Sequence, residues 1–146
     1  MAQRVTRAEV RVAGETVMSM GAGLLALVGV ARDDGPEQAR ALAGKLVHLR
    51  VFADAAGRMN RALVETAGTL GVVSQFTLLA DTRKGRRPSF GAAAPPEEAE
   101  PLIERVAETA RAAGAPVVTG RFRAHMAVEL VNDGPVTLLV DTDRAG

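Results

Sequence analysis

The chain has 146 residues, a net charge of +1 and no cysteine. This length suits one domain, which can bury roughly 68–70% of the unfolded surface without a metal or a disulfide. The lack of cysteine excludes a disulfide framework, a thiolate nucleophile and a thiolate metal site, and it fits a reducing compartment. No apolar run reaches the ~20 residues that span a bilayer, and the N-terminus has no signal-peptide core. We therefore expect a cytoplasmic protein without a membrane partner.

The near-neutral charge argues against a generic nucleic-acid coat, so any RNA contact must come from a local patch. Aromatic residues are scarce, with four Phe and no Trp or Tyr. Stacking platforms for single strands are therefore not expected.

The first third of the chain predicts two strands, a buried strand and a helix. Residues 5–12 alternate loosely, and Ala13-Gly14 suits a tight turn into a second strand that ends near Met20. The continuous apolar run at 24–30 is typical of a strand buried on both faces. Pro36 suits a first helical position, and apolar residues recur at helical spacing up to residue 49.

The middle of the chain predicts two more strands and a loop. A short strand begins at Val51-Phe52, and residues 70–76 form an almost wholly apolar strand. A long polar loop follows from about residue 81 to residue 95.

The last third predicts a helix and two strands. The helix lies between about 96 and 113, although Pro101 interrupts its pattern, so that the regular helix could begin only there. Two strands, at 126–131 and 136–141, close the chain. The fold class expected for residues 1–146 is a single compact α/β domain, mostly antiparallel sheet with two main helices.

Neither histidine has the neighbours that catalysis requires. His48 lies in the predicted helix beside core positions, where a packed or solvated role is favoured. His125 begins an alternating strand and could equally be a surface residue. The sequence offers no serine for a Ser-His-Asp triad, no metal-ligand spacing and no Gly-rich phosphate loop. We expect no metal and no cofactor.

Ser74, Gln75 and Thr77 lie at the end of an apolar strand, with Phe76 between them. Binding sites are commonly built at the ends of buried strands. A strand that simply emerges into solvent explains the same pattern, and the local pattern alone favours that interpretation.

Four cations occur within five positions of the polar loop: Arg83, Lys84, Arg86 and Arg87. Such a group can bind phosphates with salt-dependent affinity and without reading sequence. An ordinary solvated loop explains the residues equally well.

Asp133-Gly134 stands between two apolar strands and is a strong hairpin signal. Pro135 lacks an N–H where the returning strand should begin, which weakens pairing there. The Gly-Pro bond is also a candidate for the cis form, which about 5–6% of X-Pro bonds adopt in folded proteins. The local pattern does not decide between these geometries.

Together these segments resemble the D-aminoacyl-tRNA deacylase family, the D-Tyr-tRNA deacylases. Three blocks carry the resemblance: Gln3-Arg4-Val5, the segment from Ser74 to Leu78, and the segment from Asn132 to Thr137. Segments 49–52, 58–60, 80–90 and 93–96 also look familial, so the match covers nearly the whole chain in order. Family members usually carry a few more residues before the first block, which could shorten the edge pairing of the first strand. The tail after Asp141 looks individual.

The resemblance implies an obligate homodimer with active sites at the interface. Ser74, Gln75, Phe76 and Thr77 would line a pocket for the 3′-terminal adenosine of tRNA and its aminoacyl ester. Gly134-Pro135 would be a cis peptide inserted into the partner chain's pocket, and Arg4 is similar to the residue that holds this motif.

The implied activity is chiral proofreading in translation quality control, in which the ester of D-aminoacyl-tRNA is hydrolysed and L-aminoacyl esters are rejected. The catalytic candidates are Gln75, Phe76 and Thr77, with Thr77 preferred as a positioning group because no base adjoins it. Glycyl-tRNA is a further expected substrate, and DNA is not an expected partner. The alternatives are a non-catalytic tRNA-binding module, an enzyme whose main substrate is glycyl-tRNA, and a Thr-dependent hydrolase of small esters.

Overall fold

Six strands form the main sheet of the protein in this computed structural model, which describes residues 1–142. Its centre is the parallel pair of β3 (Gly23–Val28) and β6 (Thr69–Ser74), which the continuous apolar runs predicted. The short strand β7 (Val117–Thr119) extends the sheet parallel to β6. The sheet therefore combines parallel and antiparallel pairs, with antiparallel pairs in the majority.

The N-terminal strand β1 (Ala2–Val12) pairs along both of its edges. One edge is shared by β3, which pairs with residues 2–5, and by β2 (Glu15–Met20), which pairs with residues 8–12. The other edge pairs antiparallel with β8 (Met126–Leu138). Pairing with β3 and β8 begins at Ala2, so the short N-terminus does not leave this strand unpaired.

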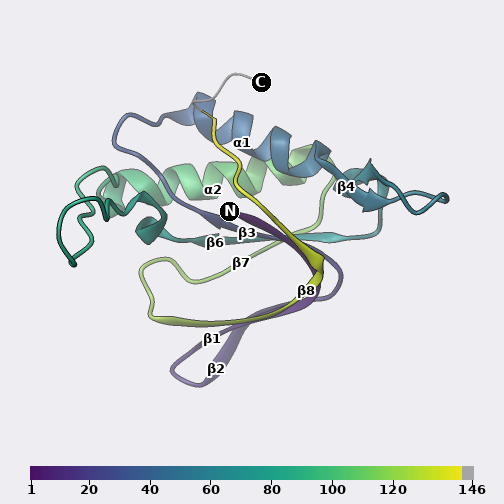
Figure 1. Ribbon diagram of the computed structural model, residues 1–146, viewed down its shortest axis with the longest axis horizontal. Helices are drawn as coiled ribbons and strands as arrows, with labels where there is room; N and C mark the ends of the chain where they lie inside the picture. Colours follow the sequence, from purple (N-terminus) through teal and green to yellow (C-terminus); the bar gives the residue numbers. More distant parts are fainter. Residues whose placement is uncertain (143–146) are drawn as a thin grey trace.

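Two helices, α1 (Pro36–His48) and α2 (Pro96–Ala112), cover one face of the β3–β6 centre, and β1, β2 and β8 curve around the other (Figure 1). Successive residues of β3 alternate between two cores, because side chains on a strand point to opposite faces. Leu24, Ala26 and Val28 join the core under the helices. Leu25 joins Val5, Val10 and Val73 in the second core. None of the described helices is long and apolar enough to cross a membrane.

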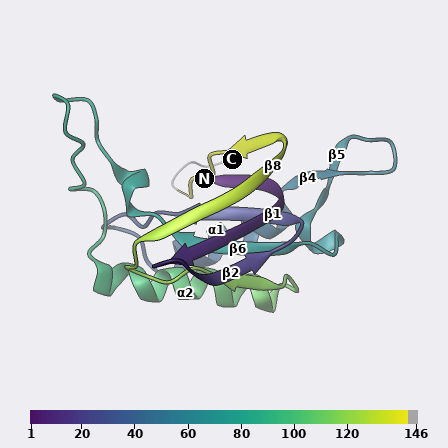
Figure 2. The same ribbon diagram turned by 90° about the horizontal axis from the view of Figure 1, so that it is seen from below.

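A two-stranded hairpin, β4 (Arg50–Ala53) and β5 (Met59–Ala62), projects from the body. A 3₁₀ turn, η1 (Leu63–Glu65), leads from it to β6. Figure 2 shows the hairpin at one end of the molecule and the loop after η2 (Phe76–Leu79) at the other. Both project away from α2.

The structure corrects the prediction of two separate C-terminal strands, at 126–131 and 136–141. β8 is one strand from Met126 to Leu138, and both of its halves pair with β1 rather than with each other. The local chemistry of Asp133-Gly134 fits a turn, yet the chain bulges outward there and continues in the same direction along β1. The tail after Asp141 lies, from residue 143 on, outside the described residues.

The second helix begins at Pro96, as predicted, and the alternative start at Pro101 is wrong. The helix runs through Pro101, whose ring faces solvent and whose missing N–H costs one helical bond. Other boundaries differ from the predictions. The strand predicted to reach Phe76 ends at Ser74. Two short strands, β5 and β7, carry no strong local pattern and were not predicted.

Candidate functional site

A cavity of about 580 Å³ opens at the carboxyl end of β6. Ser74, Gln75 and Phe76, predicted as pocket residues, line one of its sides. Phe90 comes from the end of the polar loop, and Phe122 comes from the segment between β7 and β8. Three of the four phenylalanines of the chain therefore gather at one cavity, a concentration that the low aromatic content concealed.

Phe76 and Phe90 form an aromatic pair at this cavity. Their ring centroids are 5.1 Å apart and their planes meet at 68°, an edge-to-face contact. Phe76 remains 56% exposed, which is unusual for a large apolar side chain. The pair leaves aromatic surface free to contact a flat ligand.

Thr77 lies beside the cavity without lining it. Its hydroxyl accepts a hydrogen bond from the side-chain amide of Gln75, while the main-chain N–H of Gln75 donates to Val28 at 2.8 Å. The main-chain N–H groups of Phe76 and Thr77 open η2, where a helix leaves its first donors without intrahelical partners. The predicted catalytic residues thus share one turn, with Thr77 held by its neighbour.

Gly29, immediately after β3, allows η2 to pack closely. A Cβ at this position would lie 2.4 Å from Cδ2 of Leu79 and 3.2 Å from the carbonyl oxygen of Gln75. The sequence showed Gly29 only as part of an apolar run. The structure shows that its lack of a side chain sets the position of the residues that line the cavity.

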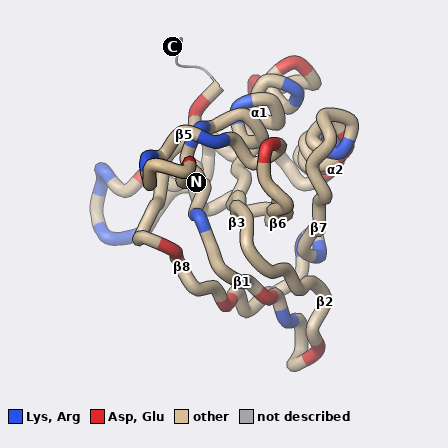
Figure 3. The backbone as a smooth tube through the Cα atoms, turned by 90° about the vertical axis from the view of Figure 1, so that its right-hand side faces the viewer, with Lys and Arg blue, Asp and Glu red and all other residues tan. Residues whose placement is uncertain are grey.

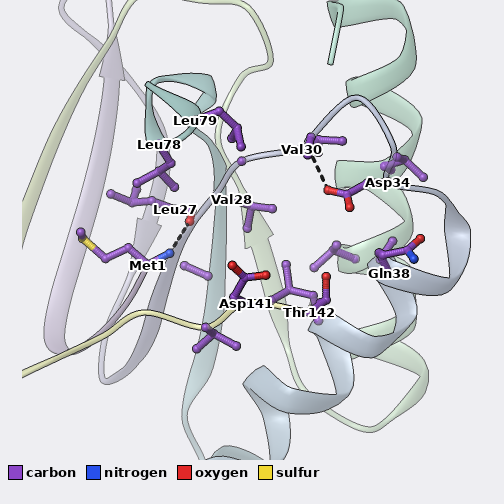
Figure 4. Close-up of a pocket in the computed structure, with 18 of the residues that line it drawn as sticks. Met1, Leu27, Val28, Val30, Asp34, Gln38, Leu78, Leu79, Asp141 and Thr142 are labelled. Atoms are coloured by element: carbon purple, nitrogen blue, oxygen red, sulfur yellow. Dashed lines mark hydrogen bonds between the residues drawn. The ribbon is translucent and has the colours of Figure 1, made fainter. Parts of the chain in front are cut away.

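A second cavity, of about 330 Å³, lies behind η2 and is lined mainly by apolar side chains (Figure 4). Leu78 and Leu79 reach it from η2, and the N-terminal amino group of Met1 donates to the carbonyl of Leu27 at 2.9 Å. Burial lowers the pKa of that amino group. None of the residues predicted to act on substrate lines this cavity.

The part of the polar loop between Asp81 and Ser89, here called the basic loop, carries the four cations and leaves the body of the protein beside the cavity. Asp81 and Ser89 pair with each other across the base of this loop. Arg83 is paired with Asp81 through two side-chain hydrogen bonds of 2.9 and 2.8 Å. These bonds, with a further one from the main-chain N–H of Arg83, hold the pKa of the Asp81 carboxyl below its ordinary value. Lys84, Arg86 and Arg87 are exposed and have no ion-pair partner among residues 1–142.

Gly134 and Pro135 lie on an outward bulge of β8, and the peptide bond between them is cis. Val5 pairs with Asn132 while Gln3 pairs with Thr137, so five steps along β8 oppose two along β1. Asn132 closes the base of the bulge: its side-chain oxygen accepts from the N–H of Val136 at 2.7 Å, and its amide donates to Thr137 at 2.9 Å. Gly134 and Pro135 are both exposed.

The side chain of Arg4 contacts the main chain of this bulge. Its Nε donates to the carbonyl oxygen of Asp133 at 3.0 Å, and its Nη1 donates to the carbonyl oxygen of Val51 at 2.6 Å. The Asp133 carboxylate lies 3.5 Å from the same guanidinium, whose side chain is only 15% exposed. A rigid, charged group thus joins the bulge to the start of the β4–β5 hairpin.

The structure does not bring the two predicted halves of the site together within one chain. Gly134 and Pro135 line neither of the two cavities described above. They are also absent from the lining of another cavity, of about 380 Å³, between α2 and the segment from Thr119 to Phe122.

The two histidines take different places. Nδ1 of His48 lies 2.9 Å from the carbonyl oxygen of Gly44 in the last turn of α1, away from the cavity. His125 is exposed at the rim of the 580 Å³ cavity, a place that its local pattern could not reveal. No cluster of three His, Cys, Asp or Glu residues that could hold a metal ion occurs among residues 1–142.

Comparison with known proteins identifies relatives over almost the whole chain. The family model described as D-Tyr-tRNA(Tyr) deacylase matches residues 1–141. A protein of Anaeromyxobacter dehalogenans named D-aminoacyl-tRNA deacylase is 61% identical over 97% of this chain and 95% of its own length. A protein of the same name from Thermomicrobium roseum is 59% identical over 96% of this chain and 91% of its own.

Solved structures share the fold. A structure named c-Myc DNA unwinding element binding protein is 36% identical, with a TM-score of 0.88 over 94% of this chain and 93% of its own. A probable eukaryotic D-amino acid tRNA deacylase is 18% identical, with a TM-score of 0.76 over 92% and 93% of the two chains, and it supports the fold alone. The prediction of a hydrolytic enzyme of this kind is confirmed. The chain belongs to the D-Tyr-tRNA(Tyr) deacylase family.

Proposed function

We propose that this chain hydrolyses the ester of D-aminoacyl-tRNA in the cytoplasm, releasing a free D-amino acid and tRNA, and that it works as a homodimer without a metal or cofactor. The observation that carries the proposal is the exposed Gly134-Pro135 bulge, which Arg4 holds away from the cavity of its own chain. A complete site then needs the bulge of one chain and the cavity of the other. The match to relatives named D-aminoacyl-tRNA deacylase supplies the substrate class.

The 580 Å³ cavity is the proposed receptor of the 3′-terminal adenosine and its ester. The exposed face of Phe76, beside Phe90, offers an aromatic surface for the adenine ring. Stacking on such a side chain is worth about 1–3 kcal/mol per base and does not depend on sequence. Ser74 and Gln75 line the same cavity and provide polar atoms for the sugar and the ester.

The exposed apolar side chains beside the bulge support the dimer. Val131 is 42% exposed and Leu139 is 81% exposed, one on each side of Gly134-Pro135 along the chain. Larger exposed apolar patches that polar residues surround mark protein–protein interaction sites. In the proposed dimer, these two side chains are covered when the bulge of their own chain enters the cavity of the partner subunit.

Selection between D and L esters follows from the geometry of the α-carbon. D and L isomers differ in the direction in which the side chain leaves that carbon. Main-chain carbonyls of Gly134 and Pro135 of the partner subunit, facing the amino group and the α-carbon, would occupy the L direction and leave the D direction open. This is rejection by steric clash. It predicts that many D side chains are accepted and that glycine, which has no side chain, is also hydrolysed.

The proposed chemistry requires no strong nucleophile. An aminoacyl ester on tRNA is already labile, so the enzyme has to orient it and stabilise a developing oxyanion. One preorganised donor of that kind is typically worth about 3–4 kcal/mol. The main-chain N–H groups of Phe76 and Thr77 and the amide of Gln75 are the candidate donors. The attacking group is the 2′-hydroxyl of the substrate's own ribose or a water molecule.

Lys84, Arg86 and Arg87 are the proposed contacts to tRNA phosphates beside the cavity. Three exposed cations on a loop that starts at Asp81 can hold the acceptor end without reading its sequence. Arg83 should contribute less, because Asp81 already pairs with it.

The decisive assay incubates matched D-, L- and glycyl-tRNAs with the protein and measures how much ester survives. The proposal predicts loss of the D and glycyl esters and survival of the L ester. Equal survival of D and L esters would end it. Binding of tRNA without any release of amino acid would favour a binding module, and turnover of simple esters that lack RNA would favour a small-ester hydrolase.

A further inference from the structure

The β4–β5 hairpin carries exposed positive charge that the proposed function leaves unused. Residues 50–62 contain Arg50, Arg58 and Arg61 against a single acidic residue, Asp54. The Asp54 carboxylate is committed to the turn: it accepts hydrogen bonds from the N–H of Arg58 at 3.0 Å, from the N–H of Ala56 at 2.8 Å and from the side chain of Asn60 at 3.1 Å. The hairpin therefore presents net positive charge on an ordered frame.

The three arginines differ in what they contact. Arg50 donates to the carbonyl oxygen of Asn60 at 3.0 Å, and Arg61 donates to the carbonyl oxygen of Glu65. The guanidinium of Arg58 has neither a hydrogen-bond nor an ion-pair partner among residues 1–142. Of the three, Arg58 is the one whose charge is free to bind a ligand.

The side chain of Arg4 joins the hairpin to the Gly134-Pro135 bulge. Arg4 donates simultaneously to Val51 in β4 and to Asp133 at the start of the bulge. Hydrogen bonds from a charged donor are stronger than those between neutral groups, so this double contact resists separation. Wherever the bulge docks, the hairpin of the same chain must lie beside it.

The hairpin lies at the opposite end of the molecule from the basic loop. Figure 1 shows β4 and β5 at one end of the long axis and the loop after η2 at the other. The tube in Figure 3, viewed from the hairpin end, shows both segments carrying Lys or Arg on the side away from α2. Within one chain, the two basic segments therefore lie far apart along the long axis, and of the two it is the basic loop that leaves the body beside the cavity. In a dimer that places the bulge of one chain in the cavity of the other, the start of the first chain's hairpin would lie near that cavity, beside which the basic loop of the second chain leaves the body.

We propose that the β4–β5 hairpin binds the phosphate backbone of the tRNA whose ester lies in the partner subunit's cavity, with Arg58 as the main contact. This inference rests on the proposed function, because it requires Gly134-Pro135 to act on the other chain. The RNA is then held between the basic loop of one chain and the hairpin of the other. Double-stranded RNA is bound largely through phosphates and 2′-hydroxyls, which suits a lone guanidinium.

The first test is the Arg58→Glu homodimer. KM for a D-aminoacyl-tRNA should rise roughly tenfold with kcat unchanged. The negative slope of log(kcat/KM) against log[salt] should become shallower by about one. Hydrolysis of the D-aminoacyl ester of adenosine alone, which has no acceptor stem, should stay at the wild-type rate. The matched control is Arg40→Glu, an equal charge change on the exposed side of α1. Equal effects of the two variants, or an equal loss on the adenosine ester, would overturn the inference.

The second test uses mixed dimers in which one chain has a blocked cavity. Ser74→Trp serves as the block, once its homodimer is shown to fold and to be inactive. If the blocked chain also carries Arg58→Glu, the wild-type cavity opposite should show the raised KM. If Arg58→Glu is instead on the chain with the open cavity, KM should be normal.

The reverse pattern would show that the hairpin serves its own chain and would overturn the inference. Failure to form dimers would also overturn it, while hydrolysis of D-aminoacyl-tRNA by the wild-type protein would still support the proposed function. A wild-type protein that hydrolyses no aminoacyl-tRNA would instead refute the proposed function.

Discussion

Arg4 donates a hydrogen bond from Nε to the main-chain carbonyl of Asp133 at 3.0 Å, across 129 positions of sequence. Because the same guanidinium also reaches Val51, the N-terminal strand fixes the bulge that carries Gly134 and Pro135. The shape of the proposed selector therefore depends on one side chain at the other end of the chain.

Replacement of Arg4 by Ala should loosen the bulge while the sheet stays folded. We expect kcat/KM for the D ester to fall by roughly 10–100-fold, which corresponds to about 1.4–2.7 kcal/mol of transition-state stabilisation. Steady-state kinetics and thermal unfolding of both variants measure this. Arg7→Ala is the matched control, since Arg7 lies on the same strand in an exposed ion pair with Glu129, and such pairs contribute about 0–1 kcal/mol. Equal kinetics for the two variants would contradict the role given to Arg4.

Replacement of Thr77 by Ala should preserve most of the activity. The Thr77 hydroxyl is engaged with Gln75 and does not line the cavity, so we expect a loss of less than roughly tenfold, smaller than that of a lost oxyanion donor. Single-turnover deacylation separates the chemical step from binding. Near-total loss in a folded Thr77→Ala variant, with activity retained in Thr77→Ser, would make the Thr77 hydroxyl the nucleophile.

Replacement of Gly29 by Ala should reduce activity through packing, because the new methyl group meets η2 and not the substrate. The new Cβ would clash with Leu79 and press on the Gln75 carbonyl, displacing η2. We expect roughly a tenfold loss, about 1.4 kcal/mol, on both D-aminoacyl-tRNA and the D-aminoacyl ester of adenosine. Adding Leu79→Ala should recover part of this loss, because the nearest clash is with the end of that side chain. Gly44→Ala in α1, which meets nothing within 4 Å, is the control and should leave kinetics unchanged. No recovery in the double variant would contradict the packing argument.

Arg83 should contribute less than Arg86 to the binding of RNA phosphates. Since Arg83 is paired with Asp81, Arg83→Ala should lower the salt slope of kcat/KM by less than Arg86→Ala, for which we expect about one. The difference should be the same at pH 6 and pH 8. The pKa of Asp81 lies below its ordinary value of about 3.9, so the pair is fully present above that pH and is lost only as pH falls through the lowered pKa. A difference between the variants that changes from pH 6 to pH 8 would contradict the pairing.

Much of the fold could be predicted from local pattern. The apolar run at 24–30 and the helical spacing after Pro36 correspond to β3 and α1. The bulge at Gly134 could not be predicted in this way, because whether the chain reverses there depends on pairing with β1, more than a hundred residues away. Local chemistry fits a hairpin, and tertiary pairing decides otherwise.

The candidate site, like the fold, could be predicted only in part from the sequence. Ser74, Gln75 and Phe76 were predicted at a strand end and line the cavity. Phe90 and Phe122 join them only through the fold, and Gly29 acts through a close contact that leaves no sequence pattern. Clustering of aromatic residues around a strand end in three dimensions is the signal that would have found the two phenylalanines.

The Gly134→Ala variant addresses the selector itself. Gly134 has φ of +140°, and a Cβ there would lie 2.8 Å from Cγ2 of Val136 and 2.9 Å from its main-chain nitrogen. The bulge must therefore shift, and we expect the ratio of D to L hydrolysis to fall roughly tenfold or more, about 1.4 kcal/mol. Gly14→Ala is the control, because Gly14 also has a positive φ, +79°, but meets nothing within 4 Å.

The most direct test of the central claim measures the D-to-L ratio in mixed dimers that carry a single open cavity. One chain carries Ser74→Trp to block its cavity, and Gly134→Ala is placed either on that chain or on the chain with the open cavity. We expect a reduced D-to-L ratio only when Gly134→Ala is on the blocked chain, opposite the open cavity. A reduced ratio only when it is on the same chain as the open cavity, or an unchanged ratio in both dimers, would contradict selection by the partner's Gly134-Pro135.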